Sequence, residues 1–249
     1  MDVFELADDL GPAKVIHLHE PSQGLRAIVV VDNVARGPAI GGTRMAEDVT
    51  LDECARLARA MTLKNAAADL PHGGAKSVIV GDPDAPRAEK ERLIRAFAGA
   101  IDDIRDYIVG PDMGTDEQCM AWIVDEIDRA VGLPREIGGI PLDELGATGW
   151  GLAHAVEVAI DYRDFKLDGA KLAVQGFGAV GKHAARFLSE RGATLVAAAD
   201  SDGCVHHPEG LSVDDLFDLK AQGRSVTDYA EGEVLDRDAI VGVPCDIWI

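Results

Sequence analysis

The stretch Lys171-Leu-Ala-Val-Gln-Gly-Phe-Gly-Ala-Val-Gly181 decides the fold of the second half of this chain. Its first residues form a short apolar run that is typical of a buried strand, and a helix is expected to begin at Ala179. The glycines follow the spacing GxGxxG. A second predicted strand, Thr194–Ala199, leads directly into Asp200, which is where such units carry a ribose-binding acid. Together these features predict a Rossmann unit that holds a dinucleotide.

Each glycine of the turn has its own expected purpose. Gly176 permits the tight turn, Gly178 lets a pyrophosphate approach the backbone, and Gly181 allows the helix to pack closely on the strand. The phosphates would then meet the helix N-terminus, which carries partial positive charge. The alternative is a plain strand–turn–helix crossover with packing glycines. The predicted cofactor-binding residues of this turn are Gly176, Phe177, Gly178, Ala179, Val180 and Gly181.

Asp200 bears on which dinucleotide is bound. A carboxylate accepts hydrogen bonds from the ribose hydroxyls of NAD and repels the 2′-phosphate of NADP. We therefore predict NAD as the cofactor and Asp200 as a further cofactor-binding residue. Ser201 follows directly and no arginine stands immediately beside it, so NADP remains an alternative.

The first half of the chain alternates strand and helix signals. Thr50 and Glu53 match a capping box, which opens an amphipathic helix that runs to about Ala68. A strand, Ser77–Val80, is expected after it, with Lys76 at its opening. The other predicted elements are strands at Lys14–Glu20, Leu25–Asp32 and from Tyr107, a loop or bent strand at Gly37–Arg44, and helices from Pro86 and over Asp116–Ala130.

The boundary between two domains is expected in the stretch Gly132–Gly146, which is rich in glycine, contains two prolines and has little periodicity. The predicted domains cover residues 1–138 and 139–249, and the fold class is α/β. After the boundary, Thr148 is expected to cap a helix over Gly149–Tyr162. The chain stops at Ile249, inside a run that reads as a buried strand, so we expect a fragment or truncated form of a longer chain, an incomplete Rossmann domain and weak activity.

Composition limits the classes of function. The 249 residues carry 24 Lys and Arg against 44 Asp and Glu, a net charge of −20 that disfavours nucleic acid and anionic membranes as partners. The acidic N-terminus and the lack of a long apolar run lead us to expect a cytoplasmic protein. The four cysteines form no CxxC pair and are expected to be free thiols. His17 with His19, and His206 with His207, lack a third partner, so no metal site is predicted.

Two lysines flank a Pro-His-Gly-Gly turn in the segment Lys64-Asn-Ala-Ala-Ala-Asp-Leu-Pro-His-Gly-Gly-Ala-Lys76. Ammonium groups that converge on one cleft repel each other, and partial burial acts in the same direction. Both effects lower the pKa of at least one lysine toward neutrality, where it can act as a base. The alternative is a helix C-terminus with a dipole-compensating lysine followed by a glycine stop.

Several segments along the chain carry a resemblance to a known family. In their order, and with the glycine turn behind them, they resemble the glutamate, leucine, phenylalanine and valine dehydrogenases over nearly the whole chain. The segments are Gly37-Pro-Ala-Ile-Gly-Gly-Thr-Arg-Met45, Met61-Thr-Leu-Lys-Asn-Ala-Ala-Ala68, His72-Gly-Gly-Ala-Lys76, Pro111-Asp-Met-Gly-Thr-Asp116 and Ala147-Thr-Gly-Trp-Gly151.

The resemblance implies an architecture and a reaction. An N-terminal α/β domain would bind the substrate and form a homo-oligomer, and the Rossmann domain would follow it. The reaction would be the reversible, NAD(P)-dependent oxidative deamination of an L-amino acid to a 2-oxo acid and ammonia. A non-catalytic module for nucleotide binding or assembly is the alternative from another class of function.

The resemblance also implies roles for individual residues. Lys64 would bind the substrate α-carboxylate, Lys76 would be the catalytic lysine, and Asp112 would pass protons to and from the substrate nitrogen. Asp112 also fits a helix cap. Arg44 is either an anion clamp or an ordinary ion pair. Two glycines would line the substrate pocket and one threonine would lie near the nicotinamide amide, namely Gly41, Gly42 and Thr148.

Ile40 is the residue that bears on substrate choice. In the glutamate enzymes a lysine at the matching position, before the Gly-Gly-x-Arg run, binds the side-chain carboxylate. Ile40 cannot pair with a carboxylate and would line an apolar pocket, so we predict leucine, valine or a related aliphatic substrate. The segments Pro111–Gln118 and Ala147–Gly149 look closer to glutamate dehydrogenases, which keeps glutamate as the alternative.

Overall fold

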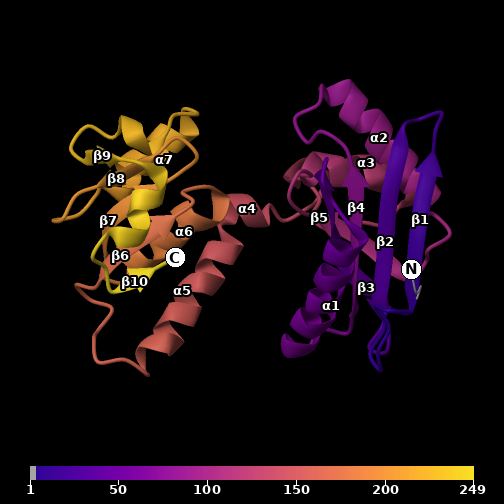
Figure 1. Ribbon diagram of the computed structural model, residues 1–249, viewed down its shortest axis with the longest axis horizontal. Coiled ribbons are helices and arrows are strands. Elements are labelled where there is room, and N and C mark those ends of the chain that lie inside the picture. The colour runs from indigo at the N-terminus through magenta and orange to yellow at the C-terminus, as the bar shows by residue number, and fades with distance from the viewer. Residues whose placement is uncertain (1–3) are drawn as a thin grey trace. The chain divides into compact units, whose positions relative to one another are not determined.

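Figure 1 shows the computed structural model, which describes residues 4–249. The chain divides into two compact units, one up to Pro141 and the other over Leu142–Ile249. The division falls inside the stretch Gly132–Gly146 from which the sequence predicts a linker. Each unit has its own sheet and its own hydrophobic core.

Unit 1 is built on a five-stranded sheet in the order β1-β2-β4-β3-β5. The pairs β1–β2 and β2–β4 are antiparallel, while β3 lies parallel to both β4 and β5. Parallel strands bring their carboxyl ends to the same edge, so the ends of β3 and β5 lie close together. The strands are β1 (Lys14–Glu20), β2 (Leu25–Asn33), β3 (Ala39–Ala46), β4 (Gly73–Val80) and β5 (Tyr107–Pro111).

Helices cover both faces of this sheet. On one face α1 (Leu51–Ala67) packs Cys54 and Ala58 against Val30 and Val78. On the other face α2 (Arg87–Ala100) and α3 (Glu117–Ile127) form the larger core with the alternate residues of β2 and β4. The predicted cap is present, because the Thr50 side chain accepts from the N–H of Glu53 at the start of α1. A 3₁₀ turn (Arg135–Ile137) follows α3.

Strand β4 begins earlier than the sequence predicts. It starts at Gly73, so Lys76 lies in the middle of a strand and not at its opening. The physical reason is the close packing around the two glycines. A Cβ on Gly73 would lie 1.7 Å from Asn33 O, and one on Gly74 would lie 2.0 Å from Thr62 N. Gly73 and Gly74 therefore belong to the strand, because only glycine fits this close to the backbones of Asn33 and Thr62. Taken from the sequence alone, the two glycines suggested a turn.

Unit 2 contains a five-stranded sheet in the order β10-β6-β7-β8-β9. β6 lies parallel to β10 and β7, whereas the pairs β7–β8 and β8–β9 are antiparallel. The strands are β6 (Lys171–Gln175), β7 (Thr194–Ala199), β8 (Cys204–His206), β9 (Glu233–Leu235) and β10 (Ile247–Trp248). The helices are α4 (Leu142–Leu145), α5 (Ala147–Ile160), α6 (Ala179–Ser189) and α7 (Val213–Ala221), with 3₁₀ turns η2 (Val226–Asp228) and η3 (Arg237–Gly242).

The predicted strand, glycine turn, helix and strand are all present in unit 2, as β6, the turn at 176–178, α6 and β7. The apolar residues of α6 form a core with residues of the strands, and Phe177 of the turn is buried in it. The α/β fold class is therefore confirmed in both units. The prediction for helix α5 was wrong at its start, since α5 begins at Ala147 with Gly146 as its N-cap. Gly146 has a φ of +77°, a conformation in which glycine is favoured over threonine.

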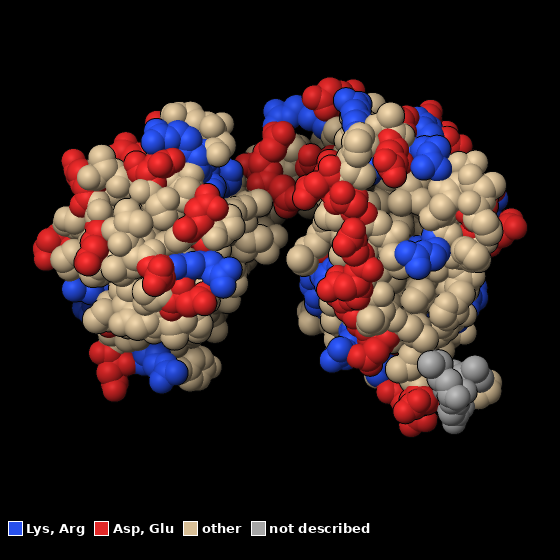
Figure 2. Space-filling view, turned by 45° about the horizontal axis from the view of Figure 1, so that its top comes forward, with Lys and Arg blue, Asp and Glu red and all other residues tan. Residues whose placement is uncertain are grey.

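The surface carries the excess of acidic residues expected from the composition. Figure 2 shows Asp and Glu side chains distributed over both units, with fewer Lys and Arg among them. None of the helices within residues 4–249 is long and apolar enough to cross a membrane. Among the same residues no group of three His, Cys, Asp or Glu side chains is placed to hold a metal ion. Cys54, Cys119 and Cys204 are buried free thiols, and Cys245 is a half-buried one.

Candidate active site

Lys76 lies buried in the middle of β4, on the face of the sheet that α1 covers. Its partner in the ladder with β2 is Val30, which packs against α1. The ammonium of Lys76 donates a hydrogen bond to the carboxylate of Asp112, the residue directly after β5. Only 7% of the Lys76 side chain and 17% of the Asp112 side chain are exposed. The structure thus brings the two predicted catalytic residues into direct contact, largely away from bulk water.

Gly42 leaves the space in which this contact forms. A Cβ on Gly42 would lie 2.8 Å from Asp112 Cβ and 3.3 Å from Lys76 Nζ. Gly41 faces the opposite side of the strand, where its Cβ would lie 1.6 Å from Ala75 O. The absence of a side chain at Gly41 is therefore explained by the close approach of β3 to β4. The expected contact of either glycine with a substrate stays a prediction.

Arg44 is the neighbour of this pair for which the sequence left two roles open. It shares a face of β3 with Ile40 and Gly42, because alternate residues of a strand point the same way. Its Nη2 lies 3.5 Å from Asp112 Oδ2, and its Nη1 donates to Glu53 Oε1 on α1. Arg44 therefore joins the Asp112 carboxylate to helix α1. The position of Arg44 beside the lysine was not predicted from the sequence; the signal that could have indicated it is the alternation of side chains along β3.

The pKa of Lys76 is lowered to about 8. The main cause is burial, which disfavours the charged ammonium, followed by the positive charge of Arg44 and then that of Lys64. Contact with the Asp112 carboxylate favours the charged form and opposes this shift. A lysine with this pKa has a substantial neutral fraction near neutral pH and can accept a proton. The effect foreseen from two converging lysines is present, but Arg44 contributes more to it than Lys64.

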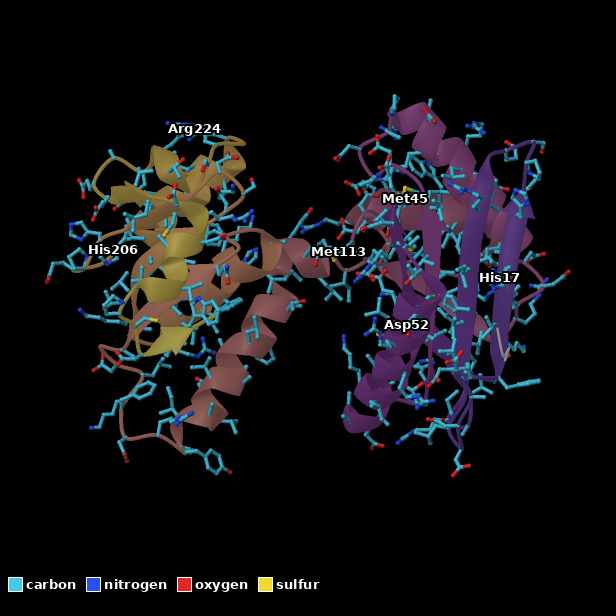
Figure 3. All side chains as sticks on the ribbon, viewed as in Figure 1. His17, Met45, Asp52, Met113, His206 and Arg224 are labelled. Atoms are coloured by element: carbon cyan, nitrogen blue, oxygen red, sulfur yellow. The ribbon has the colours of Figure 1, made fainter. Side chains whose placement is uncertain are left out.

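Asp112 is oriented by its own loop and does not cap a helix. Its Oδ1 accepts from the N–H of Met113, which is labelled in Figure 3. Its own N–H donates to Thr115 Oγ1 at 3.0 Å, and the Thr115 hydroxyl reaches Thr43 O at 2.7 Å. The N-cap of α3 is instead Asp116, whose side chain accepts from Cys119. These bonds fix the position of the Asp112 carboxylate relative to β3.

The two remaining candidates in unit 1 lie at the margin of this cluster. Lys64 is exposed in the last turn of α1, near enough for its charge to act on Lys76. Ile40 is half-buried in β3, opposite Gly74 in β4 and Ile108 in β5. Helix α1 and the strands that it covers thus supply all four of these side chains, namely Lys64, Ile40, Lys76 and Arg44.

The glycine turn of unit 2 has the backbone features expected of a dinucleotide-binding turn. Gly176 has a φ of +95°, and a Cβ on Gly181 would lie 2.1 Å from Gly176 O, so both glycines are needed to build the turn. Gly178 has open space where a Cβ would stand, and no side chain caps the helix that follows it. Ala179 and Val180 form the exposed first turn of α6, while Phe177 is buried in the core. The turn therefore fits a phosphate group against the N-terminus of α6.

Asp200 lies at the end of β7 beside this turn, but its carboxylate is already engaged. Oδ2 accepts from Lys220 Nζ at 2.8 Å and from Val226 N at 2.9 Å. Oδ1 accepts from Ser225 Oγ at 2.9 Å and from Asp202 N at 3.1 Å. Burial alone would raise the pKa of Asp200, but these hydrogen bonds outweigh it and lower the pKa. The contact of Asp200 with ribose stays a prediction, and a ribose hydroxyl would have to compete with four protein donors for this carboxylate.

Thr148, the remaining cofactor candidate, is exposed in the first turn of α5 and is not its N-cap. Gly146 takes the cap position because a Cβ there would lie 2.3 Å from the ring of His183 on α6. The helix therefore begins before Thr148 and leaves its side chain free of a capping role. Its expected contact with nicotinamide stays a prediction.

Comparison with protein families accounts for both units. The model of the Glu/Leu/Phe/Val dehydrogenase dimerisation domain matches residues 12–129. The model of the glutamate/leucine/phenylalanine/valine dehydrogenases matches residues 138–249. The chain belongs to this dehydrogenase family. The resemblance drawn from the separate motifs is confirmed, and so is the order of an N-terminal α/β domain followed by a Rossmann-type domain.

Individual relatives of this dehydrogenase family carry the name glutamate dehydrogenase. The enzyme of Aeropyrum pernix is 37% identical over 231 residues, which cover 87% of this chain and 55% of the relative. The NAD-specific glutamate dehydrogenase A of Halobacterium salinarum is 37% identical over 227 residues, 86% of this chain and 52% of the relative. The chain thus spans about half the length of the curated relatives that it matches.

A solved structure of the same family supports the fold. A hetero-hexameric glutamate dehydrogenase from Thermus thermophilus, in a leucine-bound form, superposes with a TM-score of 0.81 at 33% identity. The match covers 95% of this chain and 61% of that chain.

Proposed function

We propose that this chain carries the substrate and cofactor residues of an NAD(P)-dependent amino-acid dehydrogenase that oxidatively deaminates glutamate. The observation that carries the proposal is the buried contact between Lys76 and Asp112, in a chain that also contains the glycine turn at 176–181. A structural ion pair would not need a lysine whose pKa is lowered to about 8. The names of the relatives favour glutamate and NAD.

The side chains of unit 1 supply the proton transfers of this reaction. The 176–181 turn would hold the dinucleotide, which when bound would supply the acceptor for the hydride of the substrate Cα. Lys64 binds the α-carboxylate. Neutral Lys76 takes a proton from the water that attacks the resulting imine carbon, and Asp112 passes a proton to the nitrogen as the C–N bond breaks. The balance is amino acid, water and oxidised cofactor in, and 2-oxo acid, ammonium, reduced cofactor and one proton out.

An aliphatic amino acid such as leucine or valine is the second candidate substrate, and Ile40 is the observation that favours it. Ile40 lies on the same face of β3 as Gly42 and Arg44, and a half-buried isoleucine offers no charge for a second carboxylate. Against it, the relatives named above are glutamate dehydrogenases. The two candidates differ in one substrate group, so a single comparison of substrates separates them.

We also propose a homo-oligomer formed through unit 1 in the cytoplasm. The match of residues 12–129 to a dimerisation domain supports the interface. The net charge of −20 disfavours nucleic acid and anionic membranes as partners.

The test measures NADH formation with glutamate, leucine and valine, using the wild-type chain and Lys76→Ala. Lys90→Ala is the matched control, because Lys90 lies on α2 and its ammonium donates a hydrogen bond to the backbone oxygen of Pro83. We expect turnover with glutamate, its loss in Lys76→Ala and its retention in Lys90→Ala. Turnover of leucine or valine alone would select the second candidate. Binding of NAD with no turnover of any amino acid would reduce the chain to a nucleotide-binding module.

A further inference from the structure

Three hydroxyl groups meet in the core of unit 1, on the face of the sheet opposite to Lys76. They belong to Thr43 on β3, Ser77 on β4 and Tyr107 on β5, and all three residues are fully buried. Ser77 lies on this face because it directly follows Lys76, and successive strand residues point to opposite faces. A buried hydroxyl without a partner costs free energy, so three of them in an apolar core call for an explanation.

The three side chains form one hydrogen-bonded group, which we call the hydroxyl network. Thr43 Oγ1 lies 2.7 Å from Ser77 Oγ, and Ser77 Oγ lies 2.8 Å from Tyr107 Oη. Tyr107 donates to the backbone oxygen of Gly41 at 3.1 Å, and burial raises the pKa of its phenol, so it keeps this proton. With Thr43 donating to Ser77 and Ser77 to Tyr107, each hydroxyl proton is used once. A buried network that is satisfied in this way makes a core rigid.

The hydroxyl network ends on the part of β3 that forms the space for the active-site pair. β3 is in register with β4 over Ala39–Ile40 and again over Thr43–Ala46. Gly41 and Gly42 lie between these two stretches, and Gly42 leaves the room in which Lys76 reaches its carboxylate. A displacement of β3 at this point would therefore change that contact directly.

A second link runs from the same residues to Asp112. The backbone oxygen of Thr43 accepts from Thr115 Oγ1 at 2.7 Å. Thr115 Oγ1 accepts in turn from the N–H of Asp112 at 3.0 Å. Thr43 thus belongs to the hydroxyl network through its side chain and supports the loop of Asp112 through its backbone. Lys76 is tied to the same network because it precedes Ser77 in β4.

We propose that the hydroxyl network positions the active-site pair: it holds β3, β4 and β5 at the separation at which Lys76 and Asp112 stay in contact and away from water. The inference rests on the proposed function. The three hydroxyls lie on the opposite face of the sheet from this contact, so they act through the strands and not on the reacting atoms. Without the Tyr107 hydroxyl, the Gly41 oxygen loses a donor in the core, and β3 is held less firmly beside β4.

Tyr107→Phe tests the proposal, because it removes one oxygen atom and keeps the ring. We expect water to gain access to Lys76, so its pKa should rise from about 8 toward the ordinary lysine value of about 10.4. The rising limb of deamination against pH should move with it. The rate at pH 7 should fall about tenfold, while KM for the amino acid changes less than about twofold. The titratable groups around Lys76 are all retained in this variant, namely Asp112, Arg44, Glu53, Lys64 and the thiol of Cys54.

The pKa of Lys76 is also measured without turnover, by NMR titration of the full chain with isotope-labelled lysine, in which Lys76→Ala assigns the signal. Tyr229→Phe is the matched control, since the Tyr229 hydroxyl accepts from Ser212 N–H at 3.1 Å in unit 2. This control should lower the melting temperature and leave the pKa of Lys76 unchanged. Thr43→Val breaks the hydroxyl network at its other end and should act like Tyr107→Phe. Thr43→Ser, which keeps the hydroxyl, should restore most of the rate lost in Thr43→Val.

The outcomes separate this inference from the function on which it rests. If Tyr107→Phe lowers the melting temperature but leaves the pKa of Lys76 and the rate unchanged, the hydroxyl network only stabilises the fold and the inference is overturned. If the pKa of Lys76 rises in Tyr107→Phe while the wild-type chain turns over no amino acid, the network does position the pair and the proposed function fails. If Tyr107→Phe does not fold, the two Thr43 variants decide, and an equal pKa of Lys76 in both overturns the inference.

Discussion

Each unit places one carboxylate against one lysine, and the surroundings of the two pairs differ. In unit 1 Asp112 meets Lys76, with Arg44 nearby and one backbone N–H from Met113. In unit 2 Asp200 meets Lys220 and accepts from three further protein donors. The first pair keeps acceptor capacity and a lysine with a pKa of about 8. The second has its acceptor capacity filled.

The comparison shows that an ion pair acquires a function through what is left unsatisfied around it. A carboxylate whose lone pairs are filled by the protein stabilises the fold, because each donor would lose a partner on its removal. A carboxylate with free lone pairs, beside a lysine that gives up its proton near neutral pH, can take part in proton transfer. Asp112 and Asp200 should therefore respond differently to the same substitution.

The largest effect is expected for Asp112→Asn. The amide cannot carry a proton between the substrate nitrogen and water, so kcat should fall about 10²- to 10⁴-fold. The fold should remain, because the amide oxygen can still accept from Met113 N–H. Steady-state kinetics and a thermal melt of the same sample measure both quantities. Activity within threefold of the wild type would remove Asp112 from the chemistry.

The same substitution at Asp200 should act on stability. Asp200→Asn keeps the shape but loses the charge that attracts Lys220, and its NH₂ group faces protein donors. The free energy of unfolding should fall by about 2–3 kcal/mol. Urea denaturation measures it, and Asp228→Asn, at an exposed pair with Arg224, serves as the control with a change below about 1 kcal/mol. An equal loss of unfolding free energy in both variants would mean that the hydrogen bonds of Asp200 stabilise the fold no more than an exposed ion pair does.

The pH dependence of deamination should report the lowered pKa of Lys76. The neutral amine is the base, so below about 8 the rate should rise roughly tenfold per pH unit and then level off. In the reverse reaction the protonated lysine is needed, and the rate should fall above the same value. A rising limb near the ordinary lysine value, about 10.4, would show that burial does not tune Lys76.

The smallest effect is expected for Arg44→Met. Among neighbouring charges Arg44 lowers the pKa of Lys76 most, so its removal should move the rising limb to higher pH and slow deamination several-fold at pH 7. Arg56→Met is the control, because Arg56 is exposed on α1 and pairs with Asp52. A lower rate with an unmoved limb would leave Arg44 a structural role only.

Much of the fold followed from local patterns. The Thr50 cap, the apolar runs of β2 and β6 and the glycine spacing of the 176–181 turn each describe neighbours in sequence, and each recurs in the structure. The family was predicted because several separate motifs occur in one order. Strand β4 was misjudged because the need for Gly73 and Gly74 comes from Asn33 and Thr62, which are distant in sequence.

The candidate site was predicted in its residue types and only partly in its arrangement. Lys76 and Asp112 were named from the sequence, but their contact depends on the pairing of β4, β3 and β5. The position of Arg44 followed from the alternation along β3 once that segment was known to be a strand. Three of the four donors to Asp200 come from α7 and from the start of η2 with its N-cap Ser225, which no local pattern near Asp200 reveals.

The sequence by itself determined the α/β class, the dehydrogenase family, the glycine turn and the identity of the two lysines, because each depends on short-range spacing or on residue type. Only the tertiary structure decided that the Asp112 carboxylate keeps free acceptor capacity and that the acceptor capacity of Asp200 is filled. That distinction depends on how many donors the folded chain brings to each oxygen, and hydrogen bonds between distant segments leave no mark on the spacing of residues.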